Sequence, residues 1–218
     1  MSIMELIEME TYFDLRKDIY DENQIQNMDG GNTCYIELVK CIPEGTKNIL
    51  DIGCGTGLEL QTIWDKLPET CITGVDFSQG MLSKLHEKYP NRNITTVCKD
   101  FFEFEYKKDC YDVVLSVMTM HHFEPNLKIK LYKKFLQSLK EGGVYIEGDY
   151  MAPTQEYEEF FFSRKVRFLE LMGNPKGFFH YDTPCTVENQ KKMLHQTGFR
   201  NVYEFWKQDK TSIIVGEK

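Results

Sequence analysis

Between residues 48 and 150 the chain alternates short apolar runs with amphipathic ones, and this alternation restricts the fold more than any other feature. Three helical patterns, GLELQTIWDKL, SQGMLSKLHEKY and NLKIKLYKKFLQSLK, stand among five runs that have the length and β-branched content of strands. The five runs are NILDI (48–52), CITGVD (71–76), NITTVCKD (93–100), YDVVLSVMTM (111–120) and VYIEGDY (144–150). Strands that alternate with helices predict an α/β fold, with a mostly parallel sheet covered by helices on both faces.

The N-terminal part differs from this pattern. Residues 2–27 carry apolar positions at helical spacing and predict one helix, and 33–41 predict a second, short one. We therefore expect residues 1–44 to form a helical cap on a single domain that spans 45–218.

The pattern changes again after the fifth strand. Residues 151–185 contain a long amphipathic helix followed by an aromatic loop, and we expect them to form a lid insertion. A further helix is expected between Thr186, a candidate N-cap, and Gly198, a candidate C-terminal stop. The last two strands, NVYEFWKQD and KTSIIVGEK, are joined by a short polar turn, so we expect them to pair antiparallel.

Composition narrows the class of protein. The net charge of -8 makes nucleic acid an unlikely main partner, and no apolar run approaches the roughly 20 residues needed to cross a bilayer. The seven cysteines form no C-x-x-C pair, which favours reduced thiols and a cytoplasmic location. We expect a monomer or homodimer that acts on a small molecule and has no membrane partner.

The turn after the first strand, ILDIGCGTG, contains Gly53, Gly55 and Gly57. Three glycines in one turn indicate that something approaches the backbone closely, or that the turn needs torsions that other residues avoid. The turn lies at the carboxyl end of a strand, where open α/β sheets bind ligands. Thr56 and Glu59 have the spacing of a capping box, which predicts a helix from Gly57 and a structural role for both residues.

Two cofactor classes fit this turn. A nicotinamide dinucleotide site needs G-x-G-x-x-G, but Leu58 occupies the third glycine position. Asp76 ends the second strand 19 residues after Gly57 and could hold a ribose of either cofactor. Asp100 ends the third strand and Phe101 follows it, where an acid could accept from an adenine amino group beside an aromatic wall. Dinucleotide enzymes do not usually need that pair.

ILDIGCGTG, GVDFS, KDFFEF and YDVVLSVMTMHHF, in this order and spacing, resemble the class I S-adenosylmethionine-dependent methyltransferases. The resemblance is strong over residues 45–150. It implies a Rossmann-like sheet of seven strands with an antiparallel last strand, and S-adenosylmethionine as the cofactor.

The resemblance also implies which residues contact the cofactor. The glycine turn and Asp51 would hold its methionine part, Asp76 its ribose, and Phe77, Met81, Asp100 and Phe101 its adenine, with Ser116 near the methionine. In some relatives an N-terminal segment folds over the cofactor, so Arg16 and Tyr20 could reach the methionine carboxylate. The cofactor-binding predictions are Asp51, Gly53, Gly55, Gly57, Asp76, Phe77, Met81, Asp100, Phe101, Ser116, Arg16 and Tyr20.

The expected reaction is methyl transfer to a small molecule. His121 and His122 follow the fourth strand, where the methyl should point, and one of them could act as a general base. In the lid, His180 and Tyr181 are the substrate-binding predictions. A metal site of His180 and Asp182 lacks a supporting ligand cluster, so no metal is expected.

A nicotinamide-dependent oxidoreductase and a non-catalytic cofactor-binding module stay open as alternatives, and tRNA or protein acceptors are less favoured.

Overall fold

The computed structural model describes residues 6–27 and 33–218. Within these ranges seven strands form one sheet in the order β3-β2-β1-β4-β5-β7-β6. β7 is antiparallel to both of its neighbours, and the other pairs are parallel. The strands are β1 (Asn48–Ile52), β2 (Cys71–Asp76), β3 (Ile94–Cys98), β4 (Tyr111–Val117), β5 (Leu139–Tyr150), β6 (Arg200–Gln208) and β7 (Thr211–Glu217). The predicted Rossmann-like sheet, including the antiparallel last strand, is confirmed.

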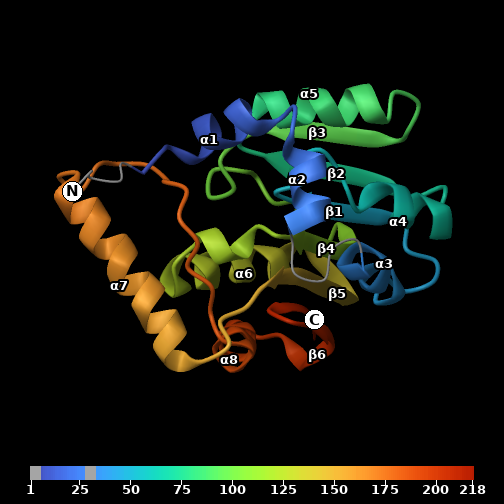
Figure 1. Cartoon of the computed structure of the whole chain (residues 1–218). Helices are drawn as coiled ribbons and strands as arrows, with labels where there is room; N and C mark the ends of the chain where they lie inside the picture. The colour runs from blue at the N-terminus through green and yellow to red at the C-terminus, as the bar shows by residue number, and fades with distance from the viewer. Residues whose placement is uncertain (1–5, 28–32) are drawn as a thin grey trace.

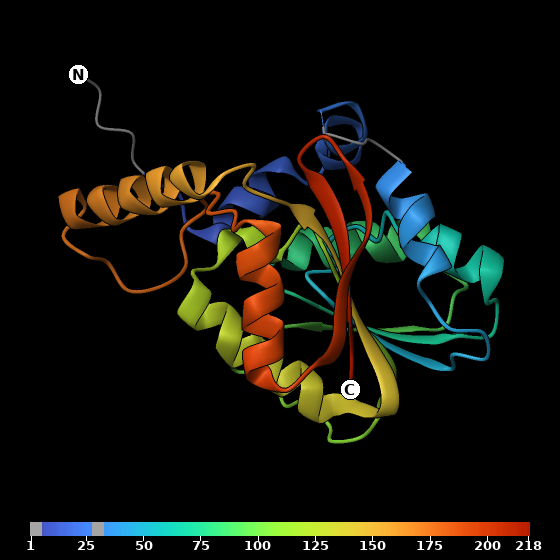
Figure 2. The ribbon, with the colours of Figure 1, turned by 90° about the horizontal axis from the view of Figure 1, so that it is seen from below.

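Helices cover both faces of the sheet because each central strand is apolar on both sides. Ile49 and Leu50 are neighbours in β1, yet they belong to buried clusters on opposite faces. Figure 2 shows the sheet between α6 and α8 on one side and α3 and α4 on the other. The helices are α1 (Met9–Arg16), α2 (Tyr20–Asn27), α3 (Thr33–Lys40), α4 (Leu60–Lys66), α5 (Gln79–Lys88), α6 (Pro125–Ser138), α7 (Gln155–Leu171) and α8 (Val187–Thr197), with a 3₁₀ turn η1 (Met120–His122).

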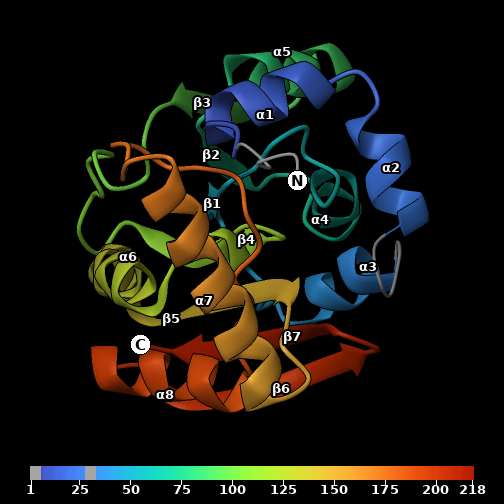
Figure 3. The ribbon, with the colours of Figure 1, turned by 60° about the vertical axis from the view of Figure 1, so that its left-hand side comes forward.

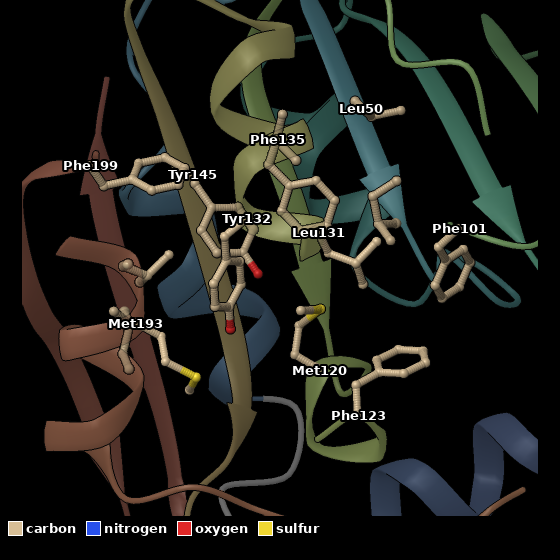
Figure 4. Close-up of a cluster of buried hydrophobic side chains, with 14 of the residues drawn as sticks. Leu50, Phe101, Met120, Phe123, Leu131, Tyr132, Phe135, Tyr145, Met193 and Phe199 are labelled. Atoms are coloured by element: carbon tan, nitrogen blue, oxygen red, sulfur yellow. The ribbon is translucent and has the colours of Figure 1, made fainter. Parts of the chain in front are cut away.

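The larger buried cluster lies on the α6 and α8 face, as Figure 4 shows. Phe135 of α6 and Phe199 lie against Tyr145 of β5, with ring centroids 5.2 and 5.8 Å away, and Leu131 and Met193 belong to the same cluster (Figure 4). The cluster continues to Met120 and Phe123 around η1, so the packed core fixes the backbone that follows β4. None of the helices in the described residues is long and apolar enough to span a membrane.

α7 stands away from the sheet, and residues 172–186 return from it toward α8 (Figure 1). Figure 3 shows α1 lying along α5. In this view α1 and α7 are both in front of the sheet. The returning segment pairs with the start of the chain, because Met9 N donates to Phe178 O at 2.8 Å and His180 N to Ile7 O at 2.9 Å. The expected cap and lid are therefore in direct backbone contact with each other.

Three expectations about helix and strand boundaries are wrong. The helix expected over residues 2–27 is two helices, α1 and α2, and its residues 2–5 lie outside the described ranges. The fifth strand, expected over residues 144–150, begins at Leu139 and includes Gly142 and Gly143.

The capping box is the third correction. α4 begins at Leu60, and the side chain of Glu59, its N-cap, makes no capping hydrogen bond. Thr56 Oγ1 donates instead to Asp21 of α2. Gly57 has a φ of +69°, a left-handed conformation that no helix residue adopts, so a helix cannot start there. By contrast, α8 has the predicted ends, with Thr186 accepting from Asn189 N and Gly198 left-handed.

Candidate active site

The glycine turn is tied to the end of β2. Gly53 N donates to Val75 O at 2.8 Å, and Gly55 N donates to Asp76 Oδ2 at 2.9 Å. Gly53 and Gly55 have φ angles of +74° and +49°, and a Cβ on Gly53 would lie 2.3 Å from Thr119 Oγ1. Glycine at position 53 is therefore required both by the torsion and by the close approach of the segment after β4.

Asp76 is buried and accepts two backbone hydrogen bonds, from Gly55 N and, at 2.8 Å, from Ser78 N. Burial raises the pKa of Asp76 to about 6, although both hydrogen bonds oppose this change. A carboxylate with four acceptor sites keeps capacity for further donors after two backbone bonds. Asp76 can therefore accept from the hydroxyls of a ribose.

Asp51 is buried, and neither of its carboxylate oxygens has a hydrogen-bond partner among the described residues. Burial, and then the charge of the neighbouring Glu59, raise the pKa of Asp51 well above its usual value. Two adjacent buried carboxyl groups without a cation are costly, so an ammonium group placed here would be stabilised. The unpartnered carboxylate thus fits the amino-acid end of S-adenosylmethionine.

A small cavity of about 30 Å³, which we call the turn pocket, lies beside the glycine turn. Seven of the predicted cofactor residues line it: Tyr20, Gly53, Gly55, Asp76, Phe77, Met81 and Phe101. The lining residues that the sequence did not predict as site residues are Met9, Phe13, Met118 and Thr119; His122 also lines the pocket.

α1 lies over this pocket and is held there by Asp14. Asp14 Oδ1 accepts from Gly80 N at 3.0 Å and from Ser78 Oγ, both at the start of α5. Met9 and Phe13 of α1 pack into the main core cluster beside Phe77. The N-terminal segment thus forms one wall of the turn pocket.

Two predicted cofactor residues are placed otherwise than expected. The hydroxyl of Ser116 lies 2.7 Å from that of Tyr145, inside the core, and Met118 and Thr119 take its expected place beside the turn. Asp100 Oδ1 accepts from Phe102 N at 2.7 Å, so it closes a turn rather than lining the pocket. Ser116 lies on the face of β4 that Tyr145 covers, which places its hydroxyl inside the core.

A larger cavity of about 380 Å³, which we call the histidine cavity, adjoins the turn pocket. It is built from α1, α2, the segment around η1 and the returning segment of the expected lid. Its lining residues are Tyr12, Phe13, Arg16, Tyr20, Asn23, Gln24, Met118, His121, His122, His180 and Asp182. Arg16 therefore lies in the histidine cavity and not in the turn pocket, whereas Tyr20 lines both.

His121 is oriented by Asp149 at the end of β5. Asp149 accepts from His121 Nδ1 at 2.5 Å and from His121 N at 2.8 Å. Burial would lower the pKa of His121, but the charge and hydrogen bond of Asp149 outweigh it and raise that pKa. The second ring nitrogen, Nε2, points to Asp182, whose Oδ1 is 3.5 Å away.

His122 and His180 surround the same carboxylate. His122 Nδ1 is 3.3 Å and His180 Nε2 is 3.9 Å from Asp182 Oδ1. Burial and the neighbouring histidine lower the pKa of His122 to about 4 and that of His180 to about 3, so both rings are neutral at pH 7. The imidazoles hold the pKa of Asp182 below its usual value despite burial.

The two substrate-binding predictions are placed differently. His180 lines the histidine cavity and stacks on Tyr12, with ring centroids 3.5 Å apart. Tyr181 packs instead with Leu6 and Phe179 in a separate cluster and lines an adjoining apolar cavity. Sequence reasoning also missed Asp149, although it is an acid at a strand end, the same signal that singled out Asp76.

Comparison with known proteins places this geometry in a family. Residues 49–143 match the family described as "Methyltransferase domain". A malonyl-[acyl-carrier protein] O-methyltransferase of Acetivibrio thermocellus is 35% identical over 97 residues, which are 44% of this chain and 33% of the relative. The match thus spans about a third of that relative's length. A carboxy-S-adenosyl-L-methionine synthase of Staphylococcus epidermidis is 23% identical over 185 residues, 80% of each chain.

Among solved structures, human N-acetylserotonin methyltransferase in complex with S-adenosylmethionine superposes with a TM-score of 0.68. It is 14% identical and aligns over 96% of this chain and 56% of the human one, so this likeness concerns the fold. The sequence match, the strand order and the glycine turn agree. Residues 49–143 therefore form a methyltransferase domain of the class I S-adenosylmethionine-dependent type, and S-adenosylmethionine is the cofactor of this family.

Proposed function

We propose that this protein transfers the methyl group of S-adenosylmethionine to a small molecule held in the histidine cavity. The observation that carries the proposal is that four residues, Phe13, Tyr20, Met118 and His122, line both the turn pocket and the histidine cavity. A methyl donor and its acceptor must be in contact, and two cavities with a common wall allow that. Because a sulfonium methyl is already activated, holding the acceptor in line can supply most of the acceleration, up to about 7–11 kcal/mol.

The cofactor roles follow from the contacts around the glycine turn. Asp51, buried without a partner in the described ranges, would neutralise the ammonium group. Asp76 would accept from the ribose, and Phe77, Met81 and Phe101 would flank the adenine. Backbone groups freed by the three glycines would contact the methionine part. Asp100 stays a proposal for the adenine edge, through the carboxylate oxygen that does not close its turn.

The acceptor would be held between the cap of residues 1–44 and the lid of residues 151–185. The backbone bonds from Met9 to Phe178 and from His180 to Ile7 join these two segments at the histidine cavity. His121 and His122 are the groups that would face the reacting atom, with His180 beside them as a binding residue. We keep Tyr181 as a support for the lid, because it packs against Phe161 and Phe168.

Arg16 favours an anionic acceptor. Its guanidinium lies 4.4 Å from the centre of the Tyr12 ring, and the residue lines the histidine cavity beside His180. A rigid guanidinium suits a carboxylate. The position of Arg16 also favours a second candidate, synthesis of a carboxylated S-adenosylmethionine. The relative named for that activity aligns over 80% of both chains.

The test is to incubate the full chain with S-adenosylmethionine carrying an isotopically labelled methyl group and a small-molecule extract, and to analyse products by mass spectrometry. We expect the label in one small anionic product, and its loss in Asp76→Ala but not in the exposed control Asp65→Ala. A carboxylated cofactor would instead support the second candidate. Label in tRNA or protein would contradict the small-molecule proposal, and cofactor binding without turnover of any kind would make the protein a binding module.

A further inference from the structure

We propose that His121, His122 and Asp182 bind one divalent transition-metal ion, in the manner of a zinc site, at the wall of the histidine cavity. One donor atom from each of the three residues lies within 4.8 Å of the others. Two imidazoles and a carboxylate are ligands that zinc and its neighbours in the first transition row accept.

Two of the three distances between donor atoms fit coordination. Asp182 Oδ1 lies 3.5 Å from His121 Nε2 and 3.3 Å from His122 Nδ1. Bonds of about 2.0–2.1 Å in a tetrahedral site separate neighbouring ligand atoms by about 3.3–3.4 Å. Both carboxylate–imidazole distances match this spacing, and the third pair of donor atoms, which lies within 4.8 Å, would have to close by at most about 1.4 Å.

Two of these donor atoms are poorly satisfied by the protein alone. His122 Nδ1 and Asp182 Oδ1 are buried and form no hydrogen bond of good geometry within residues 6–27 and 33–218, although they lie 3.3 Å from each other. Only 6% of the His122 side chain is exposed. Polar atoms buried without a partner are rare because they are costly, and coordination would satisfy both.

His121 carries the outer support that metal-binding histidines have. Its Nδ1 donates to Asp149, which fixes the tautomer and leaves the Nε2 lone pair directed at Asp182. Asp149 is itself held by the backbone N–H of His121 and, at 2.8 Å, of Tyr150. A carboxylate behind the ligating imidazole orients the ring and raises its basicity.

The loop that supplies Asp182 is fixed to the same histidine. Thr183 N and Thr183 Oγ1 both donate to His121 O, at 2.7 and 3.0 Å. Lys165 Nζ donates to His122 O at 2.9 Å, which fixes the backbone of the second ligand. The three ligands thus come from two segments about 60 residues apart that are bonded to each other at the site.

The site has the form of a catalytic metal centre and not of a closed structural one. His180 Nε2 is 3.9 Å from Asp182 Oδ1 and falls outside the group of three. Three protein ligands leave a coordination position open toward the histidine cavity, where an acceptor oxygen could bind. Metal binding stands without the proposed methyl transfer, but this use of the open position depends on it.

A protonated His121 shared between Asp149 and Asp182 is the competing arrangement. It explains the contacts of His121 at 2.5 and 3.5 Å. It leaves His122 Nδ1 with only a 3.3 Å contact of poor geometry to Asp182 Oδ1, whereas a metal ion would bind both atoms. The competing arrangement predicts that no metal binds.

The test uses the full chain after removal of metals with a chelator. Zn²⁺ is titrated in competition with a chromophoric chelator, and Co²⁺ binding is followed in the visible spectrum. We expect one equivalent of Zn²⁺ and the intense Co²⁺ bands of a four-coordinate site. His122→Ala and Asp182→Asn should each weaken Zn²⁺ binding at least about 100-fold. His86→Ala is the matched control, because His86 bonds to Thr96 away from the cavity, and it should keep full affinity.

Circular dichroism and S-adenosylmethionine affinity are measured on each variant, so that loss of the fold or of the turn pocket is recognised separately. Wild-type protein that binds no Zn²⁺, or whose Co²⁺ complex shows only weak six-coordinate bands, would overturn the proposal. Equal loss in His86→Ala, or full affinity in Asp182→Asn, would overturn it too. Should either ligand variant fail to fold, the wild-type stoichiometry and Co²⁺ spectrum decide. If the protein binds one equivalent of Zn²⁺ but transfers no methyl group, the metal site stands and only the proposed function is contradicted.

Discussion

Asp149 receives two hydrogen bonds from His121, one from the backbone N–H at 2.8 Å and one from Nδ1 at 2.5 Å. This double contact joins the end of β5 to the residues after β4. It makes the orientation of the His121 ring a property of the sheet itself and not of a loop.

The first prediction concerns this contact. Asp149→Asn should lower Zn²⁺ affinity about 10–100-fold, because the ligating imidazole loses the carboxylate that raises its basicity. Asp209→Asn, in the turn between β6 and β7, is the control for an exposed change of the same kind. The competition titration measures both. Unchanged affinity in Asp149→Asn would show that this carboxylate supports no metal ligand.

The second prediction separates torsional strain from steric contact in the glycine turn. Gly53 and Gly45 have similar φ angles, +74° and +80°, but a Cβ at Gly53 meets Thr119 whereas one at Gly45 meets nothing within 4 Å among the described residues. Gly53→Ala should therefore lower the free energy of unfolding by about 1–3 kcal/mol more than Gly45→Ala. Urea denaturation of both variants gives the difference. Equal losses would mean that Thr119 moves aside freely.

The third prediction is a pH dependence of cofactor binding. Burial raises the pKa of Asp76 to about 6, so the free protein loses this carboxylate as the pH falls below about 6. S-Adenosylmethionine affinity should fall below that pH, by at most about tenfold per unit, because the ribose hydroxyls donate to the charged form. In Asp76→Asn, affinity should be low and nearly constant from pH 5 to 8. Calorimetric titration measures the S-adenosylmethionine affinity of both proteins at each pH. If the affinity of Asp76→Asn falls in parallel with that of wild type, a group other than Asp76 causes the pH dependence.

The fourth prediction concerns the core rather than the site. Glu147 of β5 accepts from Tyr132 Oη at 2.9 Å and from Tyr145 Oη at 2.8 Å. Burial, and then the charge of Asp149, raise its pKa from 4.5 to about 7. The folded state therefore binds this proton more tightly than the unfolded state does. The stability that Glu147 contributes is fully present below about pH 4.5 and is lost as the pH rises to about 7.

Replacement by glutamine removes this titration while keeping the shape of the side chain. The free energy of unfolding of wild type minus that of Glu147→Gln should fall by up to about 3 kcal/mol between pH 4.5 and 7, then stay constant. Urea denaturation at several pH values measures it. A difference that does not change with pH would show that Glu147 keeps one protonation state throughout.

The parts of the fold that could be predicted are those set by local pattern. The strands and the order of elements follow from alternation, and α8 follows from Thr186 and Gly198 at its ends. The capping-box spacing of Thr56 and Glu59 does not mark a helix start here, because the left-handed torsion of Gly57 stops a helix from starting there.

The parts of the site that could not be predicted depend on long-range contacts. Asp14 binds the start of α5 across 66 residues, and Thr183 binds His121 across 62, with no periodic signal for either. The lining roles of Met9 and Phe13 follow only from the position of α1. Asp149 could have been predicted from the sequence, because an acid at a strand end in an α/β sheet is the same signal that indicated Asp76.

The position of α1 has a consequence for the sequence of events in a catalytic cycle. Met9 and Phe13 leave the turn pocket a volume of about 30 Å³, far less than a nucleoside occupies, while Tyr12 and Arg16 of the same helix line the histidine cavity. The nucleoside of the cofactor would enter the turn pocket only with α1 displaced. The acceptor would be held in the histidine cavity only with α1 in place. Steady-state kinetics should therefore follow a compulsory order, with the cofactor first on and the demethylated nucleoside last off.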